Sequence, residues 1–193
     1  MSCAVFLDRD GVIIDDVGLL SSVDQLRLID GSALAIQHFK QKGFRVIVVT
    51  NQTVIARGLQ TEMDVDRIHQ HLQEMLFQEI GEMVDDFYVC PHHPNADLVE
   101  YRVVCECRKP KPGLILQAAL DWHIDRSQSW LVGDRLSDVI AGSLAGCRTI
   151  LVKSGRHLDL PIESDVEFVS ATPDHVCKDL LEAEQYICGD AVN

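Results

Sequence analysis

Short apolar runs alternate along the chain with longer stretches in which apolar residues recur at helical spacing. The runs predict five buried strands, at residues 4–7, 46–50, 87–90, 129–133 and 149–152. Strands that alternate with helices are typical of a parallel sheet covered by helices on both faces. The sequence therefore predicts an α/β fold with a doubly wound, Rossmannoid parallel sheet.

The stretches between and after these runs predict the helices. Gly43 provides a C-terminal stop for the first helix, and the Thr61 hydroxyl can cap the second. The predicted helices cover residues 32–42, 61–77, 112–122, 137–145 and about 173–186. The side chains expected on the inward faces of the first two are Leu34, Ile36, His38, Phe39, Ile68, Leu72, Met75, Leu76 and Phe77.

Composition narrows the class of protein. With 193 residues, 47% of them hydrophobic, the chain is long enough for one globular domain spanning residues 1–193. A net charge of -13 argues against nucleic acid as a partner, because binding a polyanion needs a surplus of Lys and Arg. No apolar run approaches the roughly 18 residues of a membrane span, and the N-terminus lacks a signal-peptide pattern. We expect a cytoplasmic monomer with no membrane partner.

The first strand leads into LDRDGV, residues 7–12, which contains two acids two positions apart. Ligands of a doubly wound sheet bind beyond the carboxyl ends of its strands. A carboxylate there can accept a phosphoryl group, and a second one can protonate the leaving oxygen and later deprotonate water. These roles suit Asp8 and Asp10 respectively. The alternative is an ordinary strand-end turn, in which Asp and Gly are common.

Two further segments offer groups for a phosphoryl group. After the second strand, the Thr50 hydroxyl and the backbone N–H groups that follow it can bind a phosphoryl oxygen, although TNQ is also an ordinary turn. In CRKPKPG, residues 107–113, Arg108 and Lys109 are expected to act together. An ammonium group neutralises phosphoryl charge, and a guanidinium can bind a phosphate bidentately. Lys111 is equally well explained as a solvated charge near the helix start.

The fourth strand leads into VGDRLSDV, residues 132–139, where Asp134 and Asp138 are four positions apart. Clustered carboxylates suit Mg²⁺, which prefers oxygen ligands. Helix capping would explain either acid taken alone. The joint occurrence of the four segments, in this order along an alternating fold, favours phosphoryl transfer over four unrelated turns.

A Cys/His-rich loop lies between the third strand and Lys109. Its two close pairs of soft ligands give the four donors of a closed structural zinc site: Cys90, His92, Cys105 and Cys107. His93 is the alternative to His92. The seven cysteines are odd in number and no leader is recognisable, so we expect thiols and metal ligands rather than disulfides. The other cysteines are interpreted as small apolar residues: Cys3, Cys147, Cys177 and Cys188.

Taken together, LDRDGV, VVTNQTVIARG, CPHH with CECRKPKPG, and SWLVGDRLSD resemble the heptose bisphosphate and histidinol phosphatase branch of the haloacid dehalogenase superfamily. The resemblance covers about residues 4–153. It implies a phosphoaspartyl intermediate on Asp8, acid/base action by Asp10, and Mg²⁺ held by Asp8, the Asp10 carbonyl and Asp134, with Asp138 as an additional candidate. Thr50 and Lys109 would stabilise the phosphoryl group. The implied substrate contacts are Asp16, Val17, Gly18, Leu19, Asn51, Gln52, Thr53, Arg108 and Arg135.

Within that branch, IARG at residues 55–58 and the short KPKPG are closer to the heptose bisphosphate members. The implied substrate is a small sugar phosphate, the implied cofactors are Mg²⁺ and Zn²⁺, and no large cap domain is expected over the site. Two alternatives remain: a histidinol-phosphate phosphatase, and a non-catalytic binding protein that keeps the fold and the zinc loop. Asp8, Asp10, Lys109 and Asp134 are all present, which speaks against the second alternative.

Overall fold

The computed structural model describes residues 2–20, 22–159 and 172–189. Its six strands form one parallel sheet in the order β3-β2-β1-β4-β5-β6, with β1 at the centre. The strands are β1 (Ala4–Leu7), β2 (Arg45–Asn51), β3 (Asp86–Cys90), β4 (Trp130–Gly133), β5 (Arg148–Val152) and β6 (His175–Cys177). The predicted doubly wound α/β fold is confirmed, and the five predicted strands are present with ends that differ by one residue at most.

Helices connect the first five strands, as the sequence pattern predicted. The α-helices are α1 (Ser32–Gln41), α2 (Thr53–Ala56), α3 (Glu62–Ile80), α4 (Gly113–Asp121), α5 (Leu136–Ala145) and α6 (Leu180–Gly189). Three 3-10 turns complete the described elements: η1 (Val23–Gln25), η2 (Val99–Tyr101) and η3 (Arg126–Gln128). Thr61 caps α3 as expected, because its hydroxyl accepts a hydrogen bond from the Asp64 backbone N–H.

The prediction of one helix over residues 173–186 is wrong at its start. Residues His175–Cys177 instead form β6, which pairs with β5 at the edge of the sheet, and α6 begins only at Leu180. The strand has three residues, and Val176 in its middle is 42% exposed. A strand this short carries too few apolar positions for a two-residue period to be visible in the sequence.

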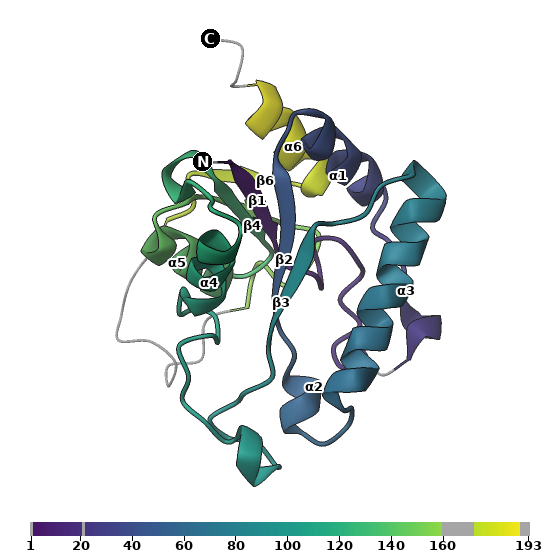
Figure 1. Ribbon diagram of the computed structural model, residues 1–193, viewed down its shortest axis with the longest axis vertical. Helices are drawn as coiled ribbons and strands as arrows, with labels where there is room; N and C mark the ends of the chain where they lie inside the picture. The colour runs from purple at the N-terminus through teal and green to yellow at the C-terminus, as the bar shows by residue number, and fades with distance from the viewer. Residues whose placement is uncertain (1, 21, 160–171, 190–193) are drawn as a thin grey trace.

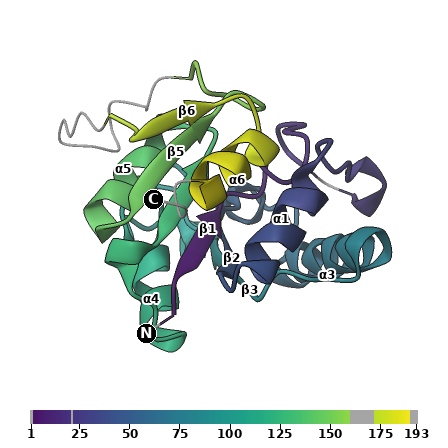
Figure 2. The ribbon, with the colours of Figure 1, turned by 90° about the horizontal axis from the view of Figure 1, so that it is seen from above.

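Alternate strand residues face two separate helical layers. On one face, Val5, Leu7 and the matching residues of β2 and β4 pack against α1, α3 and α6. On the other, Ala4, Phe6 and their neighbours pack against α4 and α5. Figure 2 shows α4 and α5 on one side of the sheet and α1 and α3 on the other. Because both faces are covered, the central strands β1 and β4 and the middle of β2 are continuous apolar runs rather than alternating with polar residues.

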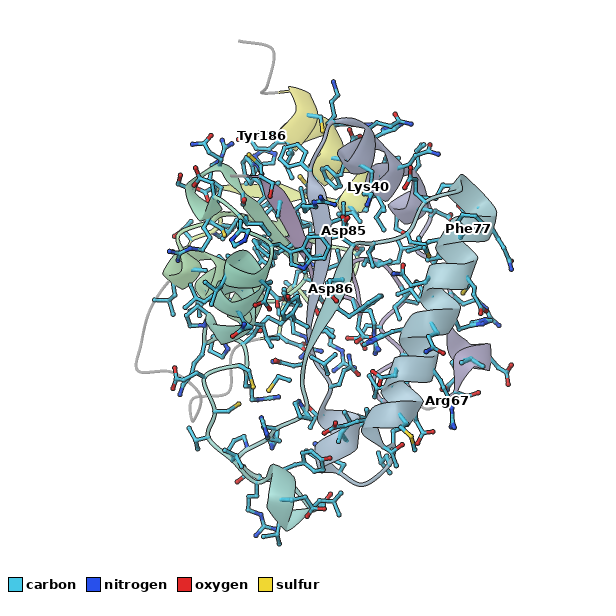
Figure 3. The ribbon with its side chains drawn as sticks, viewed as in Figure 1. Lys40, Arg67, Phe77, Asp85, Asp86 and Tyr186 are labelled. Atoms are coloured by element: carbon cyan, nitrogen blue, oxygen red, sulfur yellow. The ribbon has the colours of Figure 1, made fainter. Side chains whose placement is uncertain are left out.

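Three residues expected on inward helix faces lie outside the core, and one of them is His38, whose side chain is 38% exposed and contacts Glu184 Oε2 at 3.2 Å. Phe77, labelled on α3 in Figure 3, is 58% exposed, and Leu34 on α1 is 41% exposed. The buried stripe of α1 is formed by Ala33, Ala35, Ile36 and Phe39. The inward face of each helix is narrower than the apolar sequence pattern suggested, so α1 keeps Leu34 in solvent and α3 keeps Met63 and Phe77 there.

Asp85, which directly precedes β3, pins the amino end of the neighbouring strand β2. Its carboxylate accepts hydrogen bonds from Lys40 Nζ at 2.8 Å, Arg45 Nη1 at 2.9 Å and the Val46 backbone N–H at 2.8 Å. Lys40 and Asp85 lie close together in Figure 3. These contacts tie α1 to the start of β2, away from the carboxyl ends of the strands.

The carboxyl ends of the strands lead into the loops that form the site. In Figure 1, α2 and the loop after β3 lie below these strand ends. Within the described ranges, the long connections at residues 8–31 and 91–112 contain single turns and no separate domain, as expected for a site without a large cap. None of the helices in the described part of the chain combines the length and apolarity needed to cross a membrane.

Candidate active site

The centre of the site is an ion pair between Asp8 and Lys109. Asp8 follows β1, and its Oδ1 lies 3.0 Å from Lys109 Nζ and accepts a hydrogen bond from the Arg9 backbone N–H at 2.8 Å. Lys109 is 3% exposed, and its Nζ also lies 2.7 Å from Asp138 Oδ1 and donates to the Val49 carbonyl at 2.7 Å. Burial disfavours the ammonium form, but Asp138 and Asp8 outweigh it and raise the pKa of Lys109.

Three buried carboxylates, here called the carboxylate cluster, lie close together, and the first and last of them contact this ammonium: Asp8, Asp134 and Asp138. One oxygen from each lies within 4.8 Å of the others. Burial and the charges of Asp8 and Asp138 raise the pKa of Asp134 to about 8. A single lysine therefore does not compensate the charge of the cluster.

The carboxylate cluster fits a divalent cation. Asp134 Oδ2 accepts the Arg156 backbone N–H at 2.7 Å, whereas the buried Oδ1 has no hydrogen-bond partner among the described residues. An unpartnered buried acceptor is costly unless a further donor or cation binds it, and oxygen donors suit Mg²⁺. Glycine at position 11 lets the backbone pass close to this carboxylate: Gly11 has φ of 78°, and a Cβ there would lie 2.5 Å from Asp134 Oδ2.

Asp10 lies beside the carboxylate cluster but is not part of it. Its Oδ2 accepts hydrogen bonds from Arg9 Nη2 and Gln52 Nε2, both at 3.0 Å. Gln52 Nε2 also donates to Thr50 Oγ1 at 2.9 Å, so the ends of β1 and β2 are joined through one amide. The Asp10 side chain is 22% exposed, which leaves it accessible from the cavity.

Asn51 links the end of β2 to the loop that carries Lys109. Its side-chain amide donates to the Lys109 carbonyl at 3.0 Å and accepts the Lys109 backbone N–H at 3.1 Å. Both polar groups of the lysine backbone are thereby paired. Asn51, expected from sequence as a substrate contact, lines the cavity and also places Lys109 beside Asp8.

The four soft ligands of the loop after β3 come together as expected and form the Cys/His cluster: Cys90, His92, Cys105 and Cys107. Cys107 Sγ lies 3.2 Å from Cys90 Sγ, 3.1 Å from Cys105 Sγ and 3.4 Å from His92 Nδ1. Tetrahedral zinc with Zn–S bonds of about 2.3 Å places its ligand atoms roughly 3.7 Å apart. The contact between the Cys107 and Cys90 thiols lowers the pKa of Cys107 and raises that of Cys90, so Cys107 is the first of the two to lose its proton. The donor set therefore fits a closed zinc site.

Neighbouring histidines have different places in this loop. His92 joins the Cys/His cluster, whereas His93 lines the cavity, and its Nδ1 accepts the Asn95 backbone N–H at 3.0 Å. The His92 carbonyl accepts a hydrogen bond from Arg108 Nη1 at 3.2 Å. Through this hydrogen bond, the loop connects the Cys/His cluster to the guanidinium of Arg108, which lines the cavity.

The site opens into a cavity of about 460 Å³. Residues expected from sequence that line it are Asp8, Asp10, Asp16, Gly18, Leu19, Thr50, Asn51, Gln52, Thr53, Arg108, Lys109, Arg135 and Asp138. Val17, also expected as a substrate contact, is 46% exposed and is not part of the lining. The segment turns at Gly18, where the backbone N–H bonds the Asp16 carboxylate at 2.7 Å, and Val17 is left outside.

Four arginines line the cavity, and they differ in whether a carboxylate neutralises their charge. Arg135 and Arg156 both contact Asp16 Oδ2, at 3.2 and 2.8 Å. Arg57 and Arg108 have no carboxylate partner among the described residues, and Arg108 instead donates to the His92 carbonyl and, at 3.4 Å, to Thr53 Oγ1. Arg57 and Arg156 were not predicted from the sequence. Arg156 could have been, because it follows the fifth strand and ligands of a doubly wound sheet bind beyond the carboxyl ends of its strands.

Known proteins match both the sequence and the fold. The model of the HAD-hydrolase-like family matches residues 106–183. The D-glycero-beta-D-manno-heptose-1,7-bisphosphate 7-phosphatase of Haemophilus ducreyi is 38% identical over 167 residues, 86% of this chain and 91% of that protein. The D-glycero-D-manno-heptose-1,7-bisphosphate 7-phosphatase of Chlorobaculum tepidum is 41% identical over 192 residues, 96% of this chain and 94% of that protein.

A solved structure agrees with these relatives. The D,D-heptose 1,7-bisphosphate phosphatase of B. bronchiseptica, complexed with magnesium and phosphate, has a TM-score of 0.81 and 31% identity, covering 98% of this chain and 99% of that one. The shared fold and the phosphatases among the relatives define this chain as a phosphoric monoester hydrolase. It belongs to the haloacid dehalogenase superfamily, in the family of the heptose bisphosphate phosphatases.

Proposed function

We propose that the enzyme is Mg²⁺-dependent and removes the 7-phosphate of D-glycero-D-manno-heptose 1,7-bisphosphate through a phosphoaspartyl intermediate on Asp8. The observation that carries this proposal is the buried Asp8–Lys109 pair at the base of an open cavity, beside the unpartnered Asp134 Oδ1. The substrate is inferred from the relatives that act on heptose 1,7-bisphosphate.

In the first half-reaction, an Asp8 carboxylate oxygen attacks phosphorus and the bond from phosphorus to the sugar oxygen breaks. Asp10, as the acid, gives its proton to the departing oxygen, so that an alcohol leaves rather than an alkoxide. Lys109 compensates the charge of Asp8 as the phosphoryl group approaches, and the Thr50 hydroxyl is available to donate to a phosphoryl oxygen. Lys109 has this position before substrate binds, so it needs no rearrangement.

In the second half-reaction, water attacks the phosphorus of the aspartyl phosphate and the bond to Asp8 breaks. Asp10, now a carboxylate, takes a proton from that water, which returns both carboxyl groups to their starting forms. Asp8, Asp134 and the Asp10 backbone carbonyl would hold Mg²⁺. Asp138 is the poorer candidate because both of its oxygens have partners: Lys109 Nζ lies 2.7 Å from Oδ1, and Oδ2 accepts the Arg135 backbone N–H at 3.0 Å. When bound, Mg²⁺ supplies positive charge that stabilises the phosphoryl oxygens.

We assign a structural zinc ion to the Cys/His cluster. Four protein donors leave no open position for water, so the ion would pin the loop rather than take part in the chemistry. Cys107 directly precedes Arg108, and the His92 carbonyl binds the guanidinium of Arg108. The loop therefore holds Arg108 over the cavity from two sides.

The second phosphate of the substrate is assigned to the unpaired arginines. A bisphosphate brings a second dianion, which binds best to cations not already neutralised by a carboxylate. Arg57 and Arg108 meet this condition, whereas Arg135 and Arg156 share Asp16. This local charge offers an anion site on a protein whose net charge is -13.

A phosphate-release panel tests the proposed function. It contains both anomers of the heptose 1,7-bisphosphate, histidinol phosphate and a 3′-phosphorylated oligonucleotide, each with and without Mg²⁺. We expect Mg²⁺-dependent release of one phosphate from the bisphosphate, leaving the heptose 1-phosphate, and much slower release from the other two. Faster turnover of histidinol phosphate would contradict the substrate assignment while leaving the phosphatase class intact.

A further inference from the structure

The residue between the two acidic residues of the site is a buried arginine. Arg9 is 1% exposed, and its guanidinium Nη2 contacts both Asp10 oxygens, at 3.1 and 3.0 Å. Its Nη1 lies 3.1 Å from Nε2 of His69, a residue 60 positions away on α3. The guanidinium thus bridges the Asp10 carboxyl and a histidine from the helical layer.

The protonation state of His69 follows from its partner. A guanidinium can only donate hydrogen bonds, so Nε2 of His69 must be the acceptor, which requires a neutral ring with its proton on Nδ1. Burial and the charge of Arg9 lower the pKa of His69 to about 3, in agreement with this assignment. The ring stacks on Phe87 of β3, with centroids 4.3 Å apart and an interplanar angle of 12°. The stacking on Phe87 fixes the plane of the His69 ring, and the contact with Arg9 fixes Nε2 as its hydrogen-bond acceptor.

We propose that His69 is a positioning residue, which accepts a hydrogen bond from Arg9 and so fixes the guanidinium that orients the Asp10 carboxyl group. This inference rests on the acid/base role proposed for Asp10. Without the acceptor, Arg9 Nη1 would lose its partner, and Arg9 Nε already has none among the described residues. The guanidinium would then be held only by the group it is meant to orient.

The contacts on Asp10 indicate what this orientation achieves. Oδ2 accepts from both Arg9 and Gln52, whereas Oδ1 has only the 3.1 Å contact with Arg9 Nη2. Oδ1 is therefore the oxygen with capacity left to carry the proton that passes to the leaving group. Proton transfer in the transition state needs close alignment of donor and acceptor, so a small rotation of this carboxyl group slows the reaction.

The test uses two substrates that differ in their need for an acid. The phosphoryl transfer to Asp8 is reported by kcat/KM, measured for an alkyl phosphate such as the heptose bisphosphate and for 4-nitrophenyl phosphate, whose leaving group departs without a proton. We expect His69→Leu to lower kcat/KM for the alkyl phosphate about tenfold and that for 4-nitrophenyl phosphate less than about twofold. His69→Gln, whose amide oxygen can accept from Arg9, should recover most of the loss.

The control variants distinguish the positioning role of His69 from the acid/base role of Asp10 on which it rests. His71→Leu changes a histidine on the same helix that pairs with Glu74 and should leave both substrates unaffected. Asp10→Asn should show a larger selective loss, about 10²-fold, on the alkyl phosphate. If Asp10→Asn is not selective, the acid/base role fails. If it is selective but His69→Leu is unchanged, slows both substrates equally or is not rescued by His69→Gln, the positioning role is overturned.

Discussion

The carboxylate cluster and the Cys/His cluster lie in adjacent loops but are held in place by different means. Asp8 and Asp134 follow central strands, and Lys109 pairs with Asp8 and Asp138 in an ion-pair network whose three side chains are at most 11% exposed. The loop with the Cys/His cluster carries Val99 and Val104, which are 74% and 78% exposed. The first region is fixed by the packing of the sheet, whereas the second depends on its four ligand side chains. Substitutions should therefore affect rate in the first region and local structure in the second.

The largest expected effect is the loss of the nucleophile. Asp8→Asn should lower kcat by more than about 10³-fold, because an amide cannot accept the phosphoryl group. It also removes one of three crowded carboxylates while Lys109 keeps Asp138, so the thermal midpoint should stay within a few degrees of wild type. Steady-state kinetics and a thermal melt test both parts. Activity above a few per cent of wild type would rule out Asp8 as the nucleophile.

The next effect concerns the buried cation. Lys109→Ala should lower kcat about 10²-fold for a bisphosphate and a monophosphate alike, because the ammonium meets the phosphoryl group being transferred. Lys111→Ala is the matched control, since Lys111 lies outside the ion pairs of Asp8 and instead pairs with the exposed Glu106 at 2.7 Å. Circular dichroism checks that the variant is folded. A loss confined to the bisphosphate would show that Lys109 binds the second phosphate instead.

The third effect should discriminate between substrates. Arg108→Ala is expected to raise KM for a bisphosphate about tenfold or more, since a charge-assisted hydrogen bond is worth a few kcal/mol, and to change KM for a monophosphate little. Arg67→Ala, a substitution on the outer side of α3 labelled in Figure 3, is the control. Equal effects on the two substrates would argue against a bisphosphate and in favour of histidinol phosphate or another monophosphate.

The two regions also differ in how far the sequence predicted them. The positions of Asp8, Thr50 and Asp134 at the site were predictable, because parallel strands bring their carboxyl ends to one edge of the sheet. The four ligand types of the Cys/His cluster were readable from their spacing, and the structure brings them together. Neither argument predicts long-range pairing of backbone with side chain, such as the two hydrogen bonds between the Asn51 side chain and the Lys109 backbone.

The contact between Arg9 and His69 was not predicted for a similar reason. The two residues are 60 positions apart, and His69 occupies a position in the buried stripe of α3 where the pattern suggests only core. A buried histidine is ordinary in such a stripe, and only coordinates reveal that its acceptor faces a guanidinium. Val17 was wrongly grouped with its neighbours because a tight turn at Gly18 separates adjacent side chains.

The smallest effect on the chemistry should come from the Cys/His cluster. Cys105→Ser removes one of four ligands, so bound zinc should fall from about one per chain to well below one, measured by metal analysis. Cys3→Ser, a half-buried cysteine outside the cluster, is the matched control and should keep its zinc. If the ion stabilises the fold by about 2 kcal/mol, its loss lowers the thermal midpoint by roughly 4–8 °C in a chain of this size.

Because the His92 carbonyl holds Arg108, the Cys105→Ser variant should also raise KM for the bisphosphate severalfold while kcat for a monophosphate stays near wild type. Equal zinc content, stability and KM in Cys105→Ser and wild type would contradict a structural zinc site and would leave Arg108 to be positioned by Thr53 alone.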